Sequence, residues 1–284
     1  MAEQLLVISK NIANVHLDPT GDSALVTQGL LGQSASALDV NDDWTHVRLW
    51  DTYTGWIRTK HTCELGDGQT YPASAPYGRV KPLVIDVRRE PKPFSGILTK
   101  LTISVEVEIG EKTQDLVELK LPDGQSGWAR VKEIAIEENL VRACKPRGDV
   151  LVNHALRFIG TPYLWGGTSP FGIDCSGFVQ LLYRLTGCQL LRDAGIQASD
   201  PRATPVEPDD LAQGDLVFFC ASDDPQKTLI THVGMFIGNG NFIHSVGGGT
   251  GVTVSPLFEG EYWDRFWGAR RMCFDTSPPP EPEE

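Results

Sequence analysis

Gly172-Ile173-Asp174-Cys175-Ser176-Gly177-Phe178 is the stretch that decides both the fold and the chemistry of this chain. It follows a glycine-containing loop over 161–167 and begins an apolar segment that predicts a helix. Asp174 is a natural N-cap residue, so Cys175 falls in the first helical turn, where the helix dipole favours an anion. A cysteine placed there beside a histidine can have its pKa lowered from about 8.5 to roughly 3.5–7.5. Cys175 is therefore a candidate nucleophile, and the alternative is a small buried core residue.

Two histidines lie downstream of this cysteine in apolar, strand-like segments. His232 precedes the segment 233–237 and His244 ends the segment 241–244, with the turn Gly238-Asn239-Gly240 between them. A lone histidine in such a strand is more often a core residue with satisfied hydrogen bonds than a base. Two histidines on one hairpin can lie side by side, so that one takes the thiol proton and the other fixes its tautomer.

Composition and charge limit the classes of partner. The 284 residues are enough for two or three compact domains, and 40% hydrophobic with 22% charged residues is typical of a soluble globular protein. The formal net charge of -12 argues against nucleic acid and anionic lipid, which both need a basic surface. No segment approaches the 18 or so apolar residues of a membrane span. We expect a monomer with no nucleic-acid or membrane partner.

The cysteines and the N-terminus bear on the cell compartment. The segment 1–10 has no basic region followed by a long apolar one, so it is not expected to be a signal peptide. A cytoplasmic protein keeps its thiols reduced. No cysteine pair has CxxC spacing and no two histidines are four residues apart, so we expect neither a metal site nor a cofactor. The cysteines expected to be plain buried or partly exposed thiols are Cys63, Cys144, Cys188, Cys220 and Cys273.

The first half of the chain contains a degenerate repeat. Residues 51–60 align with residues 123–132 at an offset of 72, and five of the ten positions are identical. Each copy follows a short alternating segment, 44–49 or 116–121, which is typical of small antiparallel barrels. The shared Gly-Trp is interpreted as a turn residue followed by a ring that closes a small core. The stretch 69–78 contains two Pro and two Ala and predicts a linker between the copies.

The second half has a different pattern. Apolar residues at helical spacing predict two helices, and three apolar runs predict strands over 215–219, 233–237 and 241–244. Helices followed by antiparallel strands give an α+β domain. The tail 276–284 is rich in Pro and Glu and is expected to be disordered. The apolar faces of the two helices are Val152, Ala155, Leu156 and Ile159, then Phe178, Leu181, Leu182 and Leu185.

The second half contains five ordered motifs, which are Gly160-Thr161-Pro162-Tyr163-Leu164-Trp165-Gly166-Gly167, Asp174-Cys175-Ser176-Gly177-Phe178, Gly214-Asp215-Leu216-Val217-Phe218-Phe219, His232-Val233-Gly234-Met235-Phe236 and Phe242-Ile243-His244. By these motifs, this half resembles the NlpC/P60 family of papain-like cell-wall peptidases. Both repeat copies resemble bacterial SH3 domains, through the D-x-x-x-G-W turn and the strand before it. The resemblance implies a chain of four parts. They are an SH3-like barrel over 1–70, a linker with a second SH3-like barrel over 71–148, a catalytic domain over 149–275 and the tail over 276–284.

The resemblance also implies a role for each site residue. Cys175 is the nucleophile, His232 the general base and His244 the third polar residue. Tyr163 matches a tyrosine that donates a hydrogen bond near the oxyanion, and the alternative is an aromatic that packs under the site. Trp165 is expected to form a wall of the cleft.

The whole architecture looks like the γ-D-glutamyl-L-diamino acid endopeptidases, which require a free N-terminal L-alanine. Asp193 matches the acidic residue that pairs with the ammonium group. Tyr53 matches the aromatic that closes the far end of the cleft, and Asp174 and Ser176 are expected to face the same pocket. A substrate whose alanine is blocked would leave the buried Asp193 charge unpaired, which is costly.

Three positions depart from that pattern. Ala194 stands where relatives often carry serine, and Gln33 where they often carry glutamate, which puts the stringency for a free amine in doubt. Gln125 takes the place of Tyr53 in the second repeat, so that copy is expected to be structural.

The sequence therefore predicts a cytoplasmic cysteine endopeptidase that cuts the bond between γ-D-Glu and the diamino acid in free muropeptides, as part of cell-wall peptide recycling. A non-catalytic muropeptide-binding module and an exported cell-wall lysin are the alternatives. Whether the diamino acid is lysine or meso-diaminopimelate is left open.

Overall fold

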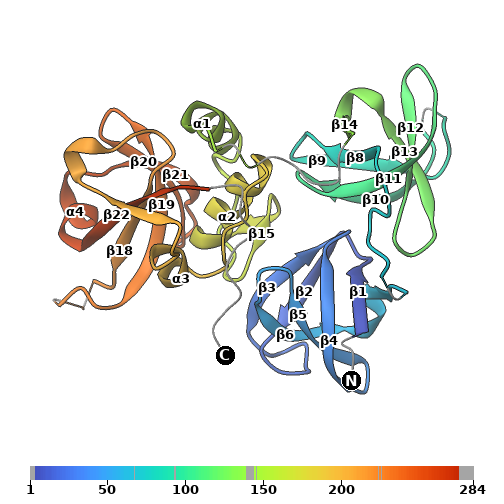
Figure 1. The fold of residues 1–284 in the computed structure, drawn as a ribbon, viewed down its shortest axis with the longest axis horizontal. Coiled ribbons are helices and arrows are strands. Elements are labelled where there is room, and N and C mark those ends of the chain that lie inside the picture. The colour runs from blue at the N-terminus through green and yellow to red at the C-terminus, as the bar shows by residue number, and fades with distance from the viewer. Residues whose placement is uncertain are drawn as a thin grey trace. The chain divides into compact units, whose positions relative to one another are not determined.

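The structure of this chain is a computed structural model (Figure 1), and it describes residues 4–66, 68–92, 94–138, 144, 146–222, 224 and 226–274. The predicted tail 276–284 lies outside the described residues. The chain divides into two compact units. The first contains Met1–Val141 together with Thr161–Asp174, and the second contains Arg142–Gly160 together with Cys175–Glu284.

The first unit begins with a seven-stranded antiparallel sheet in the order β3-β2-β6-β5-β4-β1-β7. Alternate residues of its strands point into a core that includes Ile8, Val15, Val47 and Ile57, all fully buried. Its strands are β1 (Gln4–Ile8), β2 (Ile12–His16), β3 (Leu25–Leu30), β4 (Ser34–Asn41), β5 (Trp44–Leu49), β6 (Thr54–Arg58) and β7 (Thr62–Glu64), with the 3-10 turn Thr59–His61 before β7.

A second seven-stranded sheet follows with the order β10-β9-β13-β12-β11-β8-β14. Adding seven to each strand number of the first sheet reproduces this order, so the repeat in the sequence corresponds to a repeated strand arrangement. The strands are β8 (Tyr77–Val80), β9 (Val84–Arg88), β10 (Ile97–Thr102), β11 (Glu106–Lys112), β12 (Leu116–Lys120), β13 (Ser126–Arg130) and β14 (Ile134–Glu137), with the 3-10 turn Val131–Glu133 before β14.

The repeated Gly-Trp has a different role from the one expected. Gly55 and Gly127 lie inside β6 and β13 rather than in turns. A Cβ at Gly55 would lie 2.7 Å from Cγ1 of Val15, and one at Gly127 would lie 2.6 Å from Cγ1 of Val87. Glycine is needed because a neighbouring strand passes too closely for a side chain. The tryptophans that follow are half-buried and do not fill the core, and Trp56 instead stacks on His46 with ring centroids 5.0 Å apart.

The two sheets share part of their packing within the first unit. Leu30 and Leu31, at the end of β3, join the buried cluster of the second sheet. The Tyr71 hydroxyl, from the predicted linker, donates to the Lys120 carbonyl at 2.6 Å. The segment between the sheets is thus bound to the second sheet.

The second unit is an antiparallel sheet with helices, as the α+β prediction required. The sheet order is β17-β22-β18-β19-β20-β21, and helix α2 packs against β19, β20 and helix α1. The strands are β17 (Ala203–Val206), β18 (Leu216–Cys220), β19 (Ile230–Gly238), β20 (Asn241–Val246), β21 (Gly251–Pro256) and β22 (Phe266–Met272). The helices are α1 (Gly148–Leu156), α2 (Cys175–Leu185), α3 (Ala194–Ala198) and α4 (Gly260–Arg265), and Pro208–Asp210 forms a 3-10 turn.

The first predicted helix is shorter than its apolar pattern. Helix α1 ends at Leu156, and both Leu156 and Ile159 are exposed, so only part of the expected face is buried. The second predicted helix is α2, whose expected apolar residues are all buried.

The loop that precedes Cys175 belongs to the first unit. It carries the small hairpin β15 (Thr168–Ser169) and β16 (Gly172–Ile173). The backbone N–H of Thr168 donates to Oε1 of Gln28 at 3.1 Å, and its hydroxyl donates to the Gln28 carbonyl at 3.3 Å. Two hydrogen bonds therefore connect this hairpin to strand β3.

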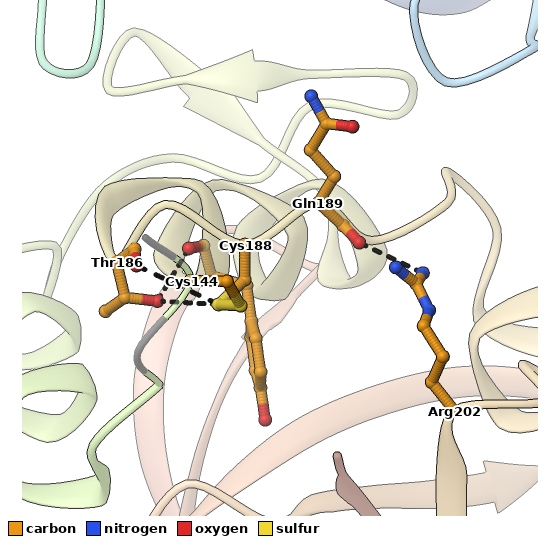
Figure 2. The surroundings of a disulfide bond; sticks show 6 residues. Cys144, Thr186, Cys188, Gln189 and Arg202 are labelled. Atoms are coloured by element: carbon orange, nitrogen blue, oxygen red, sulfur yellow. Dashed lines mark hydrogen bonds between the residues drawn. A yellow bond between two sulfur atoms is a disulfide. The ribbon is translucent and has the colours of Figure 1, made fainter. Parts of the chain in front are cut away.

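The expectation that all five cysteines outside the site are reduced was wrong for two of them. Cys144 and Cys188 form a disulfide, shown in Figure 2 beside Thr186. Cys144 precedes α1 and Cys188 follows α2, so the packing of these two helices brings together thiols that are 44 residues apart. No cysteine spacing motif in the sequence indicates this disulfide. Among the described residues the free cysteines are Cys63, Cys175, Cys220 and Cys273.

Candidate functional site

Cys175 is the first residue of helix α2 and directly follows Asp174, as the sequence indicated. The thiol-bearing residue is only 8% exposed, and the rest of the helix carries buried apolar residues such as Phe178 and Leu182. A thiolate at a helix N-terminus is stabilised by the helix dipole. Cys175 therefore lies at a helix position that favours a thiolate.

The two histidines lie side by side on the β19–β20 hairpin. Nε2 of His232 is 2.7 Å from Nδ1 of His244, which is a short hydrogen bond. His244 is fully buried, and His232 is half-buried. Because α2 packs against both of these strands, the helix that begins with Cys175 faces the strands that carry the histidine pair.

Aromatic rings surround the histidine pair. Phe219 lies opposite His232 in the β18–β19 ladder, and the Phe242 ring centroid is 4.5 Å from that of His244. Tyr262 of α4 meets the His244 ring edge-on at 5.0 Å. The apolar rings and the burial of His244 disfavour the charged imidazolium form.

The pKa values agree with this environment. Burial, then His244, then Arg265 lower the pKa of His232 to about 3. Burial alone lowers the pKa of His244 to about 4. A neutral His232 can accept the thiol proton, which is the role that the sequence assigned to it.

The hydrogen-bond chain continues beyond His244 to residues that the sequence analysis missed. Nε2 of His244 is 3.0 Å from the Ser255 hydroxyl on β21. Tyr262 of α4, whose ring packs edge-on against that of His244, was missed as well. No motif marks these residues, and only the register of β20 with β21 would have brought Ser255 to the site.

Ser176 and Asp193 lie in the second unit near a buried cation. Nη1 of Arg192, a residue 2% exposed, donates to the Ser176 hydroxyl at 2.9 Å. The Gln197 amide donates to the Ser176 carbonyl at 3.2 Å and to the Leu191 carbonyl at 2.8 Å. The turn that follows the nucleophile is thereby attached to the loop that carries Asp193. Arg192 was not singled out from the sequence, although its place beside Asp193 was the available signal.

The start of α3 concerns the predicted ammonium pocket. Asp193 is half-buried and directly precedes the helix. Ala194 is its first residue and is buried. No hydroxyl is present at that position, where the resemblance expected serine, so the polar groups of the pocket must come from other residues.

The other predicted site residues belong to the first unit. Tyr163 forms an isolated parallel bridge with Ile173. Trp165, at the same loop, is 70% exposed. The Asp174 carboxylate is buried and accepts the Gly166 N–H at 2.9 Å, so it holds this loop in shape. The roles of Tyr163 and Trp165 in the reaction stay predictions.

Two positions in the first sheet complete the set. Tyr53 is half-buried in the turn between β5 and β6, and its carbonyl accepts the Leu49 N–H at 2.8 Å. Gln33 is buried, and its side-chain oxygen accepts the Leu30 N–H at 2.8 Å. The Gln33 side chain therefore fixes the β3–β4 turn.

The described residues contain no metal-binding cluster and no membrane-spanning helix. No group of three His, Cys, Asp or Glu side chains among them could hold a metal ion. Within the same residues, no helix is both long and apolar enough to cross a membrane.

Comparison with known proteins decides the family. The profile of the NlpC/P60 family matches residues 160–271. The gamma-D-glutamyl-L-lysine dipeptidyl-peptidase of Bacillus cereus is 32% identical over 265 residues, which span 89% of this chain and 76% of that protein. The chain belongs to the NlpC/P60 family. The resemblance found in the sequence is thereby confirmed, and the protein is an NlpC/P60 cell-wall peptidase.

Two further matches cover most of this chain. Dipeptidyl-peptidase 6 of Lysinibacillus sphaericus is 28% identical over 89% of this chain and 92% of its own. The crystal structure of an NlpC/P60 family protein from Bacillus cereus has a TM-score of 0.85 at 26% identity, and the match covers 94% of this chain and 99% of that one. The profile of the bacterial dipeptidyl-peptidase Sh3 domain matches residues 15–61, so the SH3-like prediction is confirmed for the first sheet.

Proposed function

We propose that this NlpC/P60 protein is a cysteine endopeptidase that hydrolyses the bond between γ-D-Glu and the diamino acid of free muropeptides with an unblocked N-terminal L-Ala. The observation that carries the proposal is the hydrogen-bonded His232–His244 pair on two strands that pack against the helix beginning with Cys175. A thiol, a base and a residue that orients the base are the parts that acyl transfer needs.

The proposed reaction has two steps. The Cys175 sulfur attacks the γ-carbonyl carbon of D-Glu, and its proton passes to His232. The tetrahedral intermediate collapses when the C–N bond breaks and His232 gives the proton to the departing amine of the diamino acid. Water, activated by His232, then attacks the thioester and releases L-Ala-D-Glu with the thiol restored.

The oxyanion formed in each step needs hydrogen-bond donors. The backbone N–H of Cys175, at the start of α2, is one candidate donor. The Tyr163 hydroxyl is the second, by the family resemblance alone. Loss of one such donor typically lowers the rate by about 10²–10³.

The substrate class is supported by the name of a relative and by the charge of Asp193. The Bacillus cereus relative is named for a γ-D-glutamyl-L-lysine bond, so a lysine peptide is tested beside its meso-diaminopimelate counterpart. Asp193 supplies the carboxylate for the ammonium group of L-Ala. The free peptide is favoured because its ammonium group can pair with this half-buried carboxylate, whereas an acetylated amine cannot.

The proposal includes a role in cell-wall peptide recycling and a location in the cytoplasm. One observation favours the alternative function, an exported cell-wall lysin. Disulfides persist in oxidising compartments and are rare in the cytosol. The Cys144–Cys188 disulfide is therefore more typical of a protein that acts on the wall from outside. Release of peptides from purified sacculi by the disulfide-bonded protein would support the lysin.

We also infer that the second sheet is a second SH3-like domain with a structural role. The shared strand order and the same close strand approach at Gly55 and Gly127 support this inference.

The test of the proposed function is digestion of L-Ala-γ-D-Glu-L-Lys and its meso-diaminopimelate counterpart, followed by mass spectrometry. The wild type is expected to release L-Ala-D-Glu, and the Cys175→Ala and His232→Ala variants to release none. Cys63→Ala, which removes a partly exposed thiol of the first unit, is the matched control and should cleave normally. Binding of the peptide without any turnover by the folded wild type would instead favour the non-catalytic binding module.

A further inference from the structure

We infer that Gln197 is a positioning residue that fixes the place of the Asp193 carboxylate relative to the Cys175 sulfur, and so sets the preference for a free amine. The inference rests on the proposed function, in which Asp193 pairs with the ammonium group of L-Ala. It assigns a role to a buried amide outside the Cys175, His232 and His244 set.

Gln197 binds the backbone around Asp193 with both its side chain and its main chain. Its Nε2 atom donates to the Leu191 carbonyl at 2.8 Å and approaches the Arg192 carbonyl at 3.5 Å. Its backbone N–H donates to the Asp193 carbonyl at 2.9 Å, at the start of α3. Three consecutive carbonyls therefore face one residue, which restricts the backbone that carries the Asp193 side chain.

The same amide reaches the first turn of α2. Nε2 of Gln197 donates to the Ser176 carbonyl at 3.2 Å, and Ser176 directly follows Cys175. The Arg192 guanidinium adds a second link, because it donates to the Ser176 hydroxyl at 2.9 Å. Ser176 is next to the nucleophile and Arg192 is next to Asp193. The two functional groups are therefore connected through neighbours that hydrogen-bond each other directly.

The orientation of the Gln197 amide is fixed by its surroundings. Its Nε2 atom faces carbonyl oxygens, which only accept hydrogen bonds, so the reverse placement of the amide would bring oxygen against oxygen. In this orientation Oε1 is buried, and no residue that the structure describes donates to it. An unpaired buried acceptor lowers stability. This side chain therefore contributes through its donor hydrogens and not through its oxygen.

Burial makes these contacts suited to setting a distance. Gln197 is fully buried and Arg192 is 2% exposed, so water does not compete for their hydrogen bonds. Asp193 is half-buried, and part of it is still accessible to a ligand. A carboxylate held at one place pairs best with an amine at a set distance from the bond that Cys175 attacks. Preorganisation of this kind raises affinity, and a displacement of about 1 Å can cost about 10²-fold.

The first experiment measures binding of L-Ala-γ-D-Glu and its N-acetylated form to the full chain by calorimetry, which needs no turnover. The wild type is expected to bind the free dipeptide more tightly. Gln197→Met keeps the size of the side chain and removes its donor hydrogens, so it should lower this preference about tenfold by weakening only the free dipeptide. Gln213→Met is the matched control. The Gln213 amide donates to the Ile237 carbonyl at 2.9 Å in the same unit, and its loss should leave the preference unchanged.

Two further measurements separate positioning from simple destabilisation. In cleavage assays Gln197→Met should raise KM for the free peptide about tenfold with little change in kcat, and the rate at which iodoacetamide alkylates Cys175 should stay within about twofold of wild type. Because Gln197 is inferred to act through Asp193, Gln197→Met should cause no further loss of preference in an Asp193→Asn background.

The outcomes are distinct. Equal preference in the wild type and in Gln197→Met, the same loss in Gln213→Met, or a further loss in the Asp193→Asn background overturns the inference. A large change in Cys175 alkylation, or equal binding of both dipeptides by the wild type, overturns it as well. A wild type that prefers the free dipeptide but cleaves no stem peptide would remove the proposed function and not the role of Gln197.

Discussion

Nε2 of His232 lies 2.7 Å from Nδ1 of His244, and the two residues come from adjacent strands that pack against the helix beginning with Cys175. His244 is fully buried among aromatic rings, and its Nδ1 atom is hydrogen-bonded to His232. The hydrogen bond explains how an apolar strand can contain an imidazole, because the two ring nitrogens that it joins are each other's hydrogen-bond partners.

The first prediction concerns the acceptor at His244. His244→Asn places an amide oxygen near the position of Nδ1 and should keep part of the activity, whereas His244→Ala should lower kcat by about 10²-fold or more because His232 loses its orientation. Steady-state kinetics on the γ-D-Glu peptide measures both. Equal rates for the alanine and asparagine variants would show that the acceptor is unimportant.

The second prediction is loss of stability in mild acid. The unfolded histidines have a pKa of 6.5, but the folded values are about 3 for His232 and about 4 for His244. Below pH 6.5 the unfolded chain therefore binds more protons than the folded one, and stability falls as the pH drops toward 4. The slope is about 1.4 kcal/mol per pH unit for each extra proton.

Denaturant unfolding between pH 4 and 7 checks this slope. His244→Gln should reduce the proton uptake on unfolding by about one near pH 5, because it removes one buried neutral imidazole. A pH dependence that is identical in the wild type and in this variant contradicts the assignment of a lowered pKa to His244.

The third prediction concerns the repeated Gly-Trp. Gly55→Ala and Gly127→Ala should each destabilise the chain by about 1–3 kcal/mol, because the new methyl group would collide with strands β2 and β9. Gly21→Ala is the matched control: a Cβ there meets no atom within 4 Å, and the change should stay within about 0.5 kcal/mol. Thermal unfolding measures all three, and a neutral Gly55→Ala would refute the close approach.

The fourth prediction concerns the disulfide. Cys144→Ser should lower the free energy of unfolding by about 2–4 kcal/mol, because the bond closes a chain segment with a sequence separation of 44. Dithiothreitol should lower the stability of the wild type to the same value and leave the variant unchanged. If reduction has no effect on the wild type, the two thiols are not bonded in solution.

The sequence predicted the fold in its main lines because its patterns are local. The period-two alternation of 116–121, the helix after Asp174 and the apolar runs around His232 and His244 each specify their own element. The fold class and the neighbouring histidines followed from these elements.

The relationships that were missed are non-local. The sequence pattern indicates a turn at Gly55, because the actual requirement for glycine, the close approach of Val15 from another strand, is not visible in the sequence. Cys144 and Cys188 pair through helix packing, and Ser255 reaches His244 through strand register. The exposure of Ile159, beyond the end of α1, is likewise set by tertiary packing and not by helical period.

The most direct test of the central claim is a paired digestion of L-Ala-γ-D-Glu-L-Lys and its N-acetylated form by the wild type and by Asp193→Asn. The account predicts that the wild type cuts the free peptide at least about 10²-fold faster in kcat/KM, and that Asp193→Asn loses most of this preference by slowing the free peptide. Equal cleavage of both peptides by the wild type would contradict the account, since the thiol chemistry would then act without selecting a free amine.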